Sequence, residues 1–230
     1  MINSDFDWRS FDTYLFDIDG TLVNAHGGVH FNSFHTALRE VYGCDGRIDG
    51  VPVHGNTDIG ILRAALLQHG SLPADFEARL PQARELMCTE VARNADRFQV
   101  EVCPSMYELL SALRDKGKLI GVVTGNLEQI GWCKLERAGL RPFFDFGSFN
   151  DHREKREDIF QQGIEIARRL RGPETTVCFI GDTPSDIRAA KHVGMPIIAV
   201  ATGIYSQAEL AQEGPTLCVS NCQDLLLSSR

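Results

Sequence analysis

The segment 14–22 constrains the fold more than any other part of the sequence, because it places two carboxylates at the end of one predicted strand. Residues 14–16 form a short apolar, aromatic run, and the Gly-Thr pair at 20–21 stops it, which predicts a strand followed by a tight turn. In open α/β sheets the reactive groups lie just beyond the carboxyl ends of the strands. We therefore expect Asp17 and Asp19 at such an edge, although an isolated Asp-x-Asp pair can also cap a turn.

A second segment, 119–126, supports this interpretation. Its first five residues form an apolar run typical of a strand that is buried on both faces. Thr124, Gly125 and Asn126 follow this run, and Asn126 is expected to cap the helix predicted at residues 127–138. A hydroxyl beside the free amides of a helix N-terminus is a suitable phosphate site.

A third segment, 177–186, is another apolar strand that ends in acidic residues. Asp182 follows the strand, and Asp186 falls early in a helix that Ser185 can cap. A basic group precedes the amphipathic stretch 159–170; it consists of Arg153, Lys155 and Arg156.

Together these segments resemble the motifs of the haloacid dehalogenase (HAD)-like hydrolase superfamily, and most closely its phosphoglycolate-phosphatase-like branch. Motif one matches residues 17–22, motif two 124–126 and motif four 181–186, in the family's order. The usual Lys-Pro pair of motif three is absent, which leaves its cation open between Arg156, which we favour, and Lys155. The resemblance covers nearly the whole chain.

The resemblance implies a phosphate-transfer chemistry in which Asp17 is the nucleophile and forms an aspartyl-phosphate. Asp19 would protonate the leaving oxygen and then take a proton from water. A hard cation is needed between two anions, and the oxygen ligands implied by Asp17, the Asp19 carbonyl and Asp182 suit Mg²⁺. Asp186 would support the metal site without binding the ion directly. The implied phosphoryl-binding residues are Gly20, Thr124, Gly125 and Asn126.

The order of predicted elements indicates an insertion, because helical patterns replace the strand–helix alternation between residues 29 and 90. We predict an α/β, doubly wound, Rossmann-like parallel sheet, with residues 1–23 and 103–230 in the core and residues 24–102 in an all-helical cap. Pro81 is expected in the first turn of the third cap helix. The alternative is a helical subdomain with no role in substrate access.

Two features of the cap segment have alternative interpretations. Residues 54–58 resemble a substrate-facing loop of the branch, but Thr57 or Asp58 can equally cap the helix that begins near Ile59. His26 and His30 are expected to be neutral surface side chains, because no third ligand has suitable spacing.

Composition excludes several classes of partner. The formal charge of −8 argues against non-specific binding to nucleic acid or to an anionic membrane. The seven scattered cysteines contain no Cys-x-x-Cys pair and indicate free thiols in a reducing compartment. With no apolar leader visible, we predict a cytoplasmic protein. The sequence does not indicate its oligomeric state.

The predicted function is a magnesium-dependent phosphatase acting on a small phosphorylated metabolite, with phosphoglycolate suggested only by the name of the branch. A phosphomutase or a haloacid dehalogenase on the same fold is the alternative, and a non-catalytic binding module is a third. Halide displacement by Asp17 needs no acid at position 19, so Asp19 counts against dehalogenation. The presence of all four residues Asp17, Asp19, Thr124 and Asp182 counts against a binding module.

Overall fold

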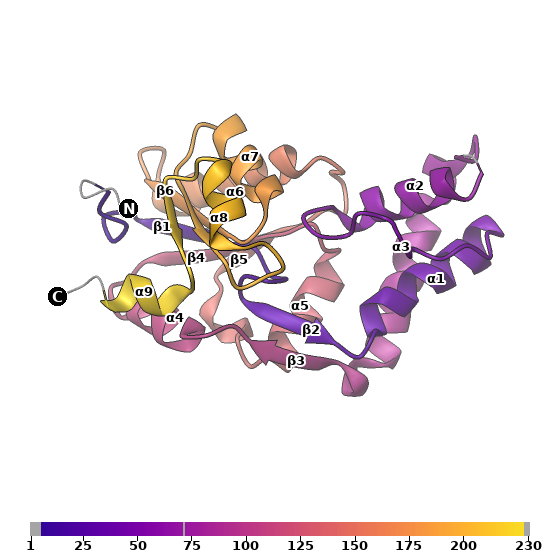
Figure 1. The fold of residues 1–230 in the computed structure, drawn as a ribbon, viewed down its shortest axis with the longest axis horizontal. Coiled ribbons are helices and arrows are strands. Elements are labelled where there is room, and N and C mark those ends of the chain that lie inside the picture. The colour runs from indigo at the N-terminus through magenta and orange to yellow at the C-terminus, as the bar shows by residue number, and fades with distance from the viewer. Residues whose placement is uncertain (1–5, 71, 228–230) are drawn as a thin grey trace.

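The computed structural model describes residues 6–70 and 72–227, and it has a sheet domain beside a group of long helices (Figure 1). Six strands form one sheet in the order β5-β4-β1-β6-β7-β8, and every neighbouring pair runs parallel. Their bounds are β1 (Thr13–Phe16), β4 (Leu119–Val123), β5 (Phe146–Ser148), β6 (Val177–Gly181), β7 (Ile197–Val200) and β8 (Leu217–Val219). The predicted doubly wound α/β fold is confirmed.

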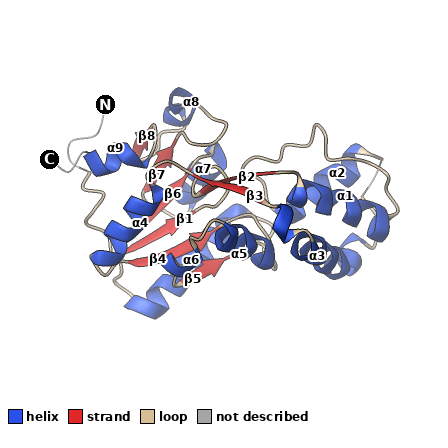
Figure 2. Cartoon of the chain, turned by 90° about the horizontal axis from the view of Figure 1, so that it is seen from below, coloured by secondary structure: helices blue, strands red, loops and turns tan. Residues whose placement is uncertain are grey.

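Helices cover both faces of this sheet, which explains why its central strands are apolar on both sides. Tyr14 and Phe16 of β1 pack on one face with α4 (Met106–Asp115), α5 (Glu128–Arg137) and α9 (Cys222–Leu227). Leu15 packs on the other face with α6 (Arg156–Arg171), α7 (Pro184–His192) and α8 (Gln207–Gln212). In the view from below in Figure 2, the strands of this sheet lie at one end of the molecule and α1, α2 and α3 at the other.

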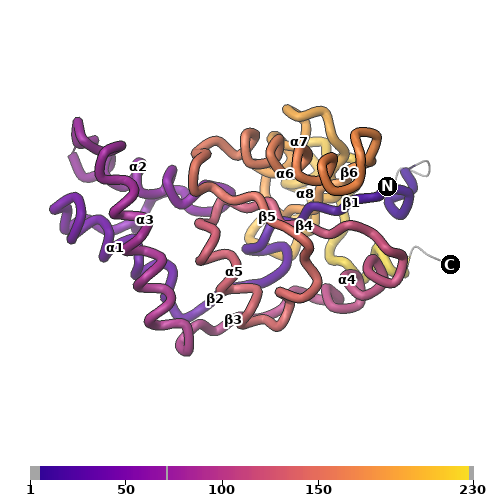
Figure 3. Tube along the Cα trace, turned by 180° about the vertical axis from the view of Figure 1, so that it is seen from behind, coloured from indigo at the N-terminus to yellow at the C-terminus, as the bar shows by residue number. Residues whose placement is uncertain are grey.

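The inserted helices have an apolar core of their own. They are α1 (Val29–Tyr42), α2 (Asp58–Gln68) and α3 (Phe76–Arg93), followed by the short 3₁₀ helix η1 (Ala95–Arg97). The antiparallel ribbon of β2 (Val23–His26) and β3 (Gln99–Val102) leads into and out of them (Figure 3). Leu127 and Ile130 belong to the same apolar cluster, so the cap helices lean on α5. The limits of the cap at residues 24 and 102 stay a prediction.

Three local expectations from the sequence were wrong. Helix α3 begins at Phe76 and holds Pro81 in its interior, because Phe76 and Leu80 are both buried one turn apart. Thr183, and not Ser185, caps α7, since its hydroxyl accepts from the Asp186 amide. The cap position of α5 is Leu127, which leaves Asn126 outside that helix.

The strand after α5 starts later than the sequence pattern predicts. The pattern predicts a strand at residues 143–147, but the 3₁₀ helix η2 (Arg141–Phe143) occupies the first of these positions and Phe146–Ser148 pairs with β4. Within the described ranges, no helix is both long and apolar enough to cross a membrane.

Candidate active site

Three neighbouring strands bring the predicted site residues to one edge of the sheet. Phe16 at the end of β1 lies opposite Val122 of β4 and Ile180 of β6, so the residues that follow these strands share one level. A cavity of about 520 Å³ lies at this edge, and both the core and the cap line it. Asp17, Thr124 and Asp182 are among its lining residues.

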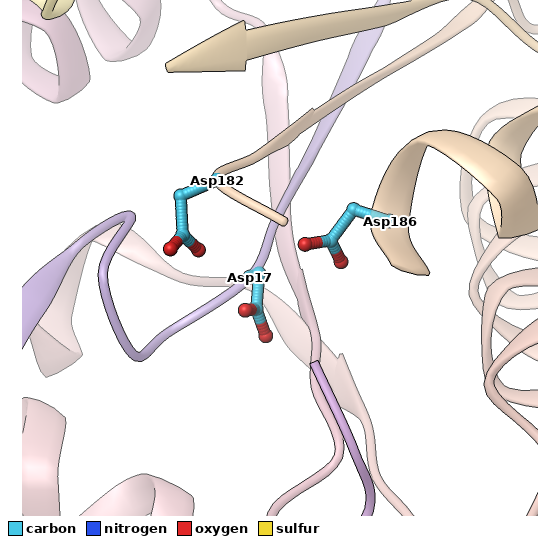
Figure 4. Close-up of side chains that lie close together, drawn as sticks. All are labelled: Asp17, Asp182 and Asp186. Atoms are coloured by element: carbon cyan, nitrogen blue, oxygen red, sulfur yellow. The ribbon is translucent and has the colours of Figure 1, made fainter. Parts of the chain in front are cut away.

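Asp17, Asp182 and Asp186 form a buried cluster, with one oxygen from each lying within 4.8 Å of the others. Figure 4 shows the three carboxylates close together, with that of Asp186 directed toward the other two. Desolvation, together with the neighbouring carboxylates, raises the pKa of Asp17 to about 7, although Arg156 opposes this. The same two causes raise the pKa of Asp182 well above its usual range. The cluster therefore carries more negative charge than its burial favours, and a cation would relieve it.

Arg156 is the guanidinium that reaches this cluster. Its Nη2 lies 3.0 Å from Asp17 Oδ2 and donates to Asp186 Oδ1 at 2.6 Å, while its Nε donates to the same oxygen at 2.8 Å. The side chain is 8 % exposed at the first position of α6. Lys155, one residue earlier, is exposed, so the structure brings only Arg156 of this pair into the site.

Asp186 has its oxygens engaged by protein groups. Arg156 occupies Oδ1, and the amide and hydroxyl of Thr183 donate to Oδ2 at 3.1 and 2.6 Å. In contrast, Asp182 accepts one hydrogen bond, from Thr21 at 3.0 Å. Asp17 and Asp182 are therefore the two carboxylates that would hold a hard divalent cation, and Asp186 would orient Arg156 beside them.

Two glycines allow the chain to close around Asp182. Gly20 has φ +81° in the turn after β1, and a Cβ there would lie 2.2 Å from Asp182 Oδ2. A Cβ on Gly203, in the loop after β7, would lie 1.8 Å from the same oxygen. No larger residue fits at either position while the carboxylate keeps this orientation.

Asp19 also lines the cavity and belongs to a separate hydrogen-bond network. Lys134 Nζ donates to Asp19 Oδ2 and to Asn126 Oδ1, both at 2.6 Å. The Asn126 amide nitrogen donates to Asp19 Oδ2 at 2.9 Å and to Thr124 Oγ1 at 3.1 Å. Burial raises the pKa of Asp19, but the charge and hydrogen bond of Lys134 outweigh it and hold this pKa below its usual value.

Sequence reasoning missed Lys134. It lies in α5 four residues after the buried Ile130, at a position where the helical pattern predicts an apolar side chain. The sequence did contain a signal for it, because a lysine occupies a position on the buried face of the helix that follows motif two. A buried lysine needs a partner for its charge. The partner is Asp19, 115 residues earlier in the chain.

The start of α2 is bonded to the phosphate-binding loop predicted at residues 124–126. The Asp58 amide donates to the Gly125 carbonyl at 2.8 Å, and Asp58 Oδ2 accepts from the Leu127 amide at 2.8 Å. Thr57 caps α2 through Gly60, so the capping role belongs to Thr57 and the contact with the core belongs to Asp58. His30 is part of this contact and is not a free surface residue, because its Nε2 lies 3.2 Å from Asp58 Oδ1.

The loop before α6 gives the cap a second attachment. Thr57 Oγ1 donates to the Glu154 carbonyl at 2.9 Å, and Arg63 binds both Glu154 carboxylate oxygens at 2.8 Å. The cap therefore lies closed over the cavity, and Val29, Phe34 and Phe98 are among the residues that it contributes to the lining.

Comparison with known proteins supports the family resemblance that the sequence motifs indicate. A family model described as haloacid dehalogenase-like hydrolase matches residues 11–194. The chain belongs to this family. It is 27% identical over 217 residues to "Probable phosphatase IndB" of Dickeya dadantii, an alignment that covers 92% of this chain and 90% of that protein. It is 24% identical to a phosphoglycolate phosphatase of Pseudomonas savastanoi, over 92% of this chain and 77% of that one.

The fold of this HAD-like hydrolase also matches solved structures. A predicted phosphoglycolate phosphatase from Haemophilus somnus superposes with a TM-score of 0.70 at 20% identity, over 96% of this chain and 98% of that one. The resemblance to the phosphoglycolate-phosphatase-like branch is confirmed, and the enzyme stands among the phosphatases of the family.

Proposed function

We propose that this HAD-like phosphatase requires magnesium and hydrolyses the monoester of a small phosphorylated metabolite through an aspartyl-phosphate on Asp17. The observation that supports this most is the buried cluster of Asp17, Asp182 and Asp186 with Arg156 as its nearby guanidinium. A nucleophile in this position attacks an anion, so its surroundings must supply positive charge.

Each residue has a role in two successive displacements. Asp17 attacks phosphorus, and Arg156 stabilises the negative charge that builds up beside it. Thr124, Gly125 and Asn126 hold the phosphoryl oxygens. Lys134 favours the ionised form of Asp19, which takes a proton from the water that cleaves the aspartyl-phosphate. For the first displacement Asp19 must first bind a proton, which it then gives to the leaving oxygen.

Magnesium would be held by Asp17 and Asp182, with the Asp19 carbonyl as the third predicted protein ligand. When bound, it supplies charge neutralisation between the nucleophile and the phosphoryl oxygens. The raised pKa values of Asp17 and Asp182 in the metal-free protein support this fit, because two buried carboxylates that resist ionisation are stabilised by a cation.

The cap half of the cavity favours esters whose organic part is uncharged. The lysine and arginine that line the cavity within the described ranges are Lys134 and Arg156, and both are paired with carboxylates. The cap wall mixes apolar side chains such as Phe34 with polar ones such as His54 and Asn56. Within the described ranges it adds no lysine or arginine, so a substrate carboxylate, as in phosphoglycolate, would find neither of these cations there to pair with. An ester with a short apolar group would instead bury that group there.

A substrate panel with the wild-type enzyme and Asp17→Asn tests this proposal. Release of inorganic phosphate from an aryl phosphate with magnesium is expected from the wild type only. Turnover by Asp17→Asn near that of the wild type would refute the nucleophile. Phosphoglycolate giving a higher kcat/KM than uncharged alkyl phosphates would contradict only the specificity.

The same panel separates the alternative chemistries. A phosphomutase would return an isomeric phosphate ester with little free phosphate, and a dehalogenase would release halide from a haloacid. Asp19 favours the phosphatase, because halide needs no proton to leave. The seven free cysteines support a reducing, cytoplasmic compartment, which we include in the proposal.

A further inference from the structure

The side chain of Lys134 is only 2 % exposed, and its ammonium group reaches the active site from the middle of α5. Burying a lysine is costly unless its charge is paired and hydrogen-bonded. Here the ammonium donates two hydrogen bonds of 2.6 Å, one to Asp19 Oδ2 and one to Asn126 Oδ1. A shorter apolar residue would serve the packing of α5, so the charge itself calls for an explanation.

The two acceptors of Lys134 are also bonded to each other. The Asn126 amide nitrogen donates to Asp19 Oδ2 at 2.9 Å, which closes a three-membered ring of side chains. Its second hydrogen bond, to Thr124 Oγ1, extends this ring to the phosphate-binding loop. The ring therefore joins the acid–base carboxylate to the residues that hold the phosphoryl group.

The ring fixes the orientation of the Asp19 carboxylate as well as its position. Both donors bind Oδ2, and 42 % of the Asp19 side chain stays exposed in the cavity. A carboxylate with one oxygen held by two donors cannot rotate freely about its terminal bond, so Oδ1 remains the oxygen for proton transfer. Catalytic groups held within a fraction of an ångström of the reacting atoms gain orders of magnitude in rate.

We infer that Lys134 is a positioning residue, which fixes Asp19 and Asn126 in one geometry for proton transfer and phosphoryl binding. This inference rests on the proposed role of Asp19. Lys134 acts through its two partners and does not itself touch the phosphoryl group. Its contribution should therefore shrink to the part that acts through Asn126 when Asp19 is removed, whereas a contribution to folding alone should persist in full.

A double-mutant cycle on kcat tests this dependence. The variants are Lys134→Met, Asp19→Ala and the double variant, assayed with an aryl phosphate so that the loss of Asp19 leaves a measurable rate. We expect Lys134→Met to lower kcat about 100-fold with KM nearly unchanged, as for a group that acts in the transition state. In the Asp19→Ala background the same substitution should cost no more than about 10-fold, because only its contact with Asn126 is then left to lose. Equal costs in both backgrounds would overturn the inference.

Two further variants separate positioning from folding. Methionine fills the volume of the lysine stem, and Glu136→Gln, on the exposed face of α5, is the matched control that should keep wild-type activity. Should Lys134→Met fail to fold, Lys134→Ala is assayed with added ethylammonium ion. Restoration of kcat by the amine supports the inference, and no restoration in a folded variant overturns it.

The proposed role of Asp19 and the inferred role of Lys134 can be refuted separately. An Asp19→Ala enzyme as active as the wild type on both alkyl and aryl phosphates would remove the proposed role of Asp19, and the inference with it. An impaired Asp19→Ala enzyme beside a fully active Lys134→Met enzyme would leave the proposed function intact and refute Lys134 alone.

Discussion

Replacing Asp17 by asparagine should stabilise the metal-free protein while abolishing its activity. Desolvation and the nearby carboxylates raise the pKa of Asp17 from 3.8 to about 7, against the opposing charge of Arg156. Ionised Asp17 therefore costs on the order of 4 kcal/mol of folding free energy above that pH. Asparagine has nearly the same shape and carries no charge, so most of this cost should be removed.

The expected change is large enough for a thermal-unfolding assay. For a chain of this size, 1 kcal/mol shifts Tm by about 2–4 °C, so even half of the effect raises Tm by at least about 4 °C. The measurement is made in excess chelator at pH 8. Saturating magnesium should reduce the difference in Tm between variant and wild type, because the cation stabilises the wild type through the carboxylate that the variant lacks.

The stability of the metal-free protein depends on pH because Asp17 binds its proton more tightly in the folded protein than in the unfolded chain. The folded-state pKa lies above the unfolded value, so in the window from 3.8 to about 7 the folded protein binds more protons than the unfolded chain. The stability of the metal-free wild type therefore falls as pH rises through this window. The difference in stability between Asp17→Asn and the wild type should grow as pH rises through the same window and should vanish below it.

Asp12 provides a control of opposite sign. Hydrogen bonds from the amide and hydroxyl of Thr176 lower the pKa of Asp12, so its ionised form is favoured in the folded protein. Asp12→Asn should therefore destabilise the protein at pH 8. If Asp17→Asn is no more stable than the wild type in chelator at pH 8, the cluster is not electrostatically strained and the reasoning is wrong.

Further predictions concern the cations and the cap. Arg156→Ala should lower kcat about 10²–10³-fold, because Arg156 contacts the nucleophile, whereas Lys155→Ala should change kcat little. Similar losses of kcat at both positions would contradict the assignment of Arg156. Chelation should abolish the activity, which magnesium but not calcium should restore, and Asp182→Asn should need far more magnesium than the wild type. Full activity in excess chelator would refute the metal requirement. Asp58→Ala should raise KM for every ester alike, which Michaelis kinetics on two substrates would show.

The sequence predicted the groups that follow β1, β4 and β6 because each lies at a strand end, and parallel strands bring such ends together. Asp17, Thr124 and Asp182 needed only strand order and direction to be placed. Arg156 was favoured over Lys155 by its spacing from the apolar pair that starts α6, and the structure brings it to Asp17 and Asp186.

Contacts between distant segments were not predictable in the same way. Lys134 breaks the apolar stripe of its helix, but no local pattern shows that Asp19 faces it. The contact of Asp58 with the Leu127 amide likewise depends on how the cap rests on the core. The start of α3 was misplaced because a proline is tolerated inside a helix whose buried face compensates for the missing hydrogen bond.

The bonds between Asp58 and the loop at residues 125–127 affect the end of the catalytic cycle. The same short segment holds the cap through Gly125 and Leu127 and is expected to grip the phosphoryl group through Thr124 and Asn126. Cap opening must break hydrogen bonds made by that segment, so the departure of inorganic phosphate and the movement of the cap are linked events. Product inhibition by phosphate should accordingly vary with the sequence of the cap, although no cap residue need touch the ion.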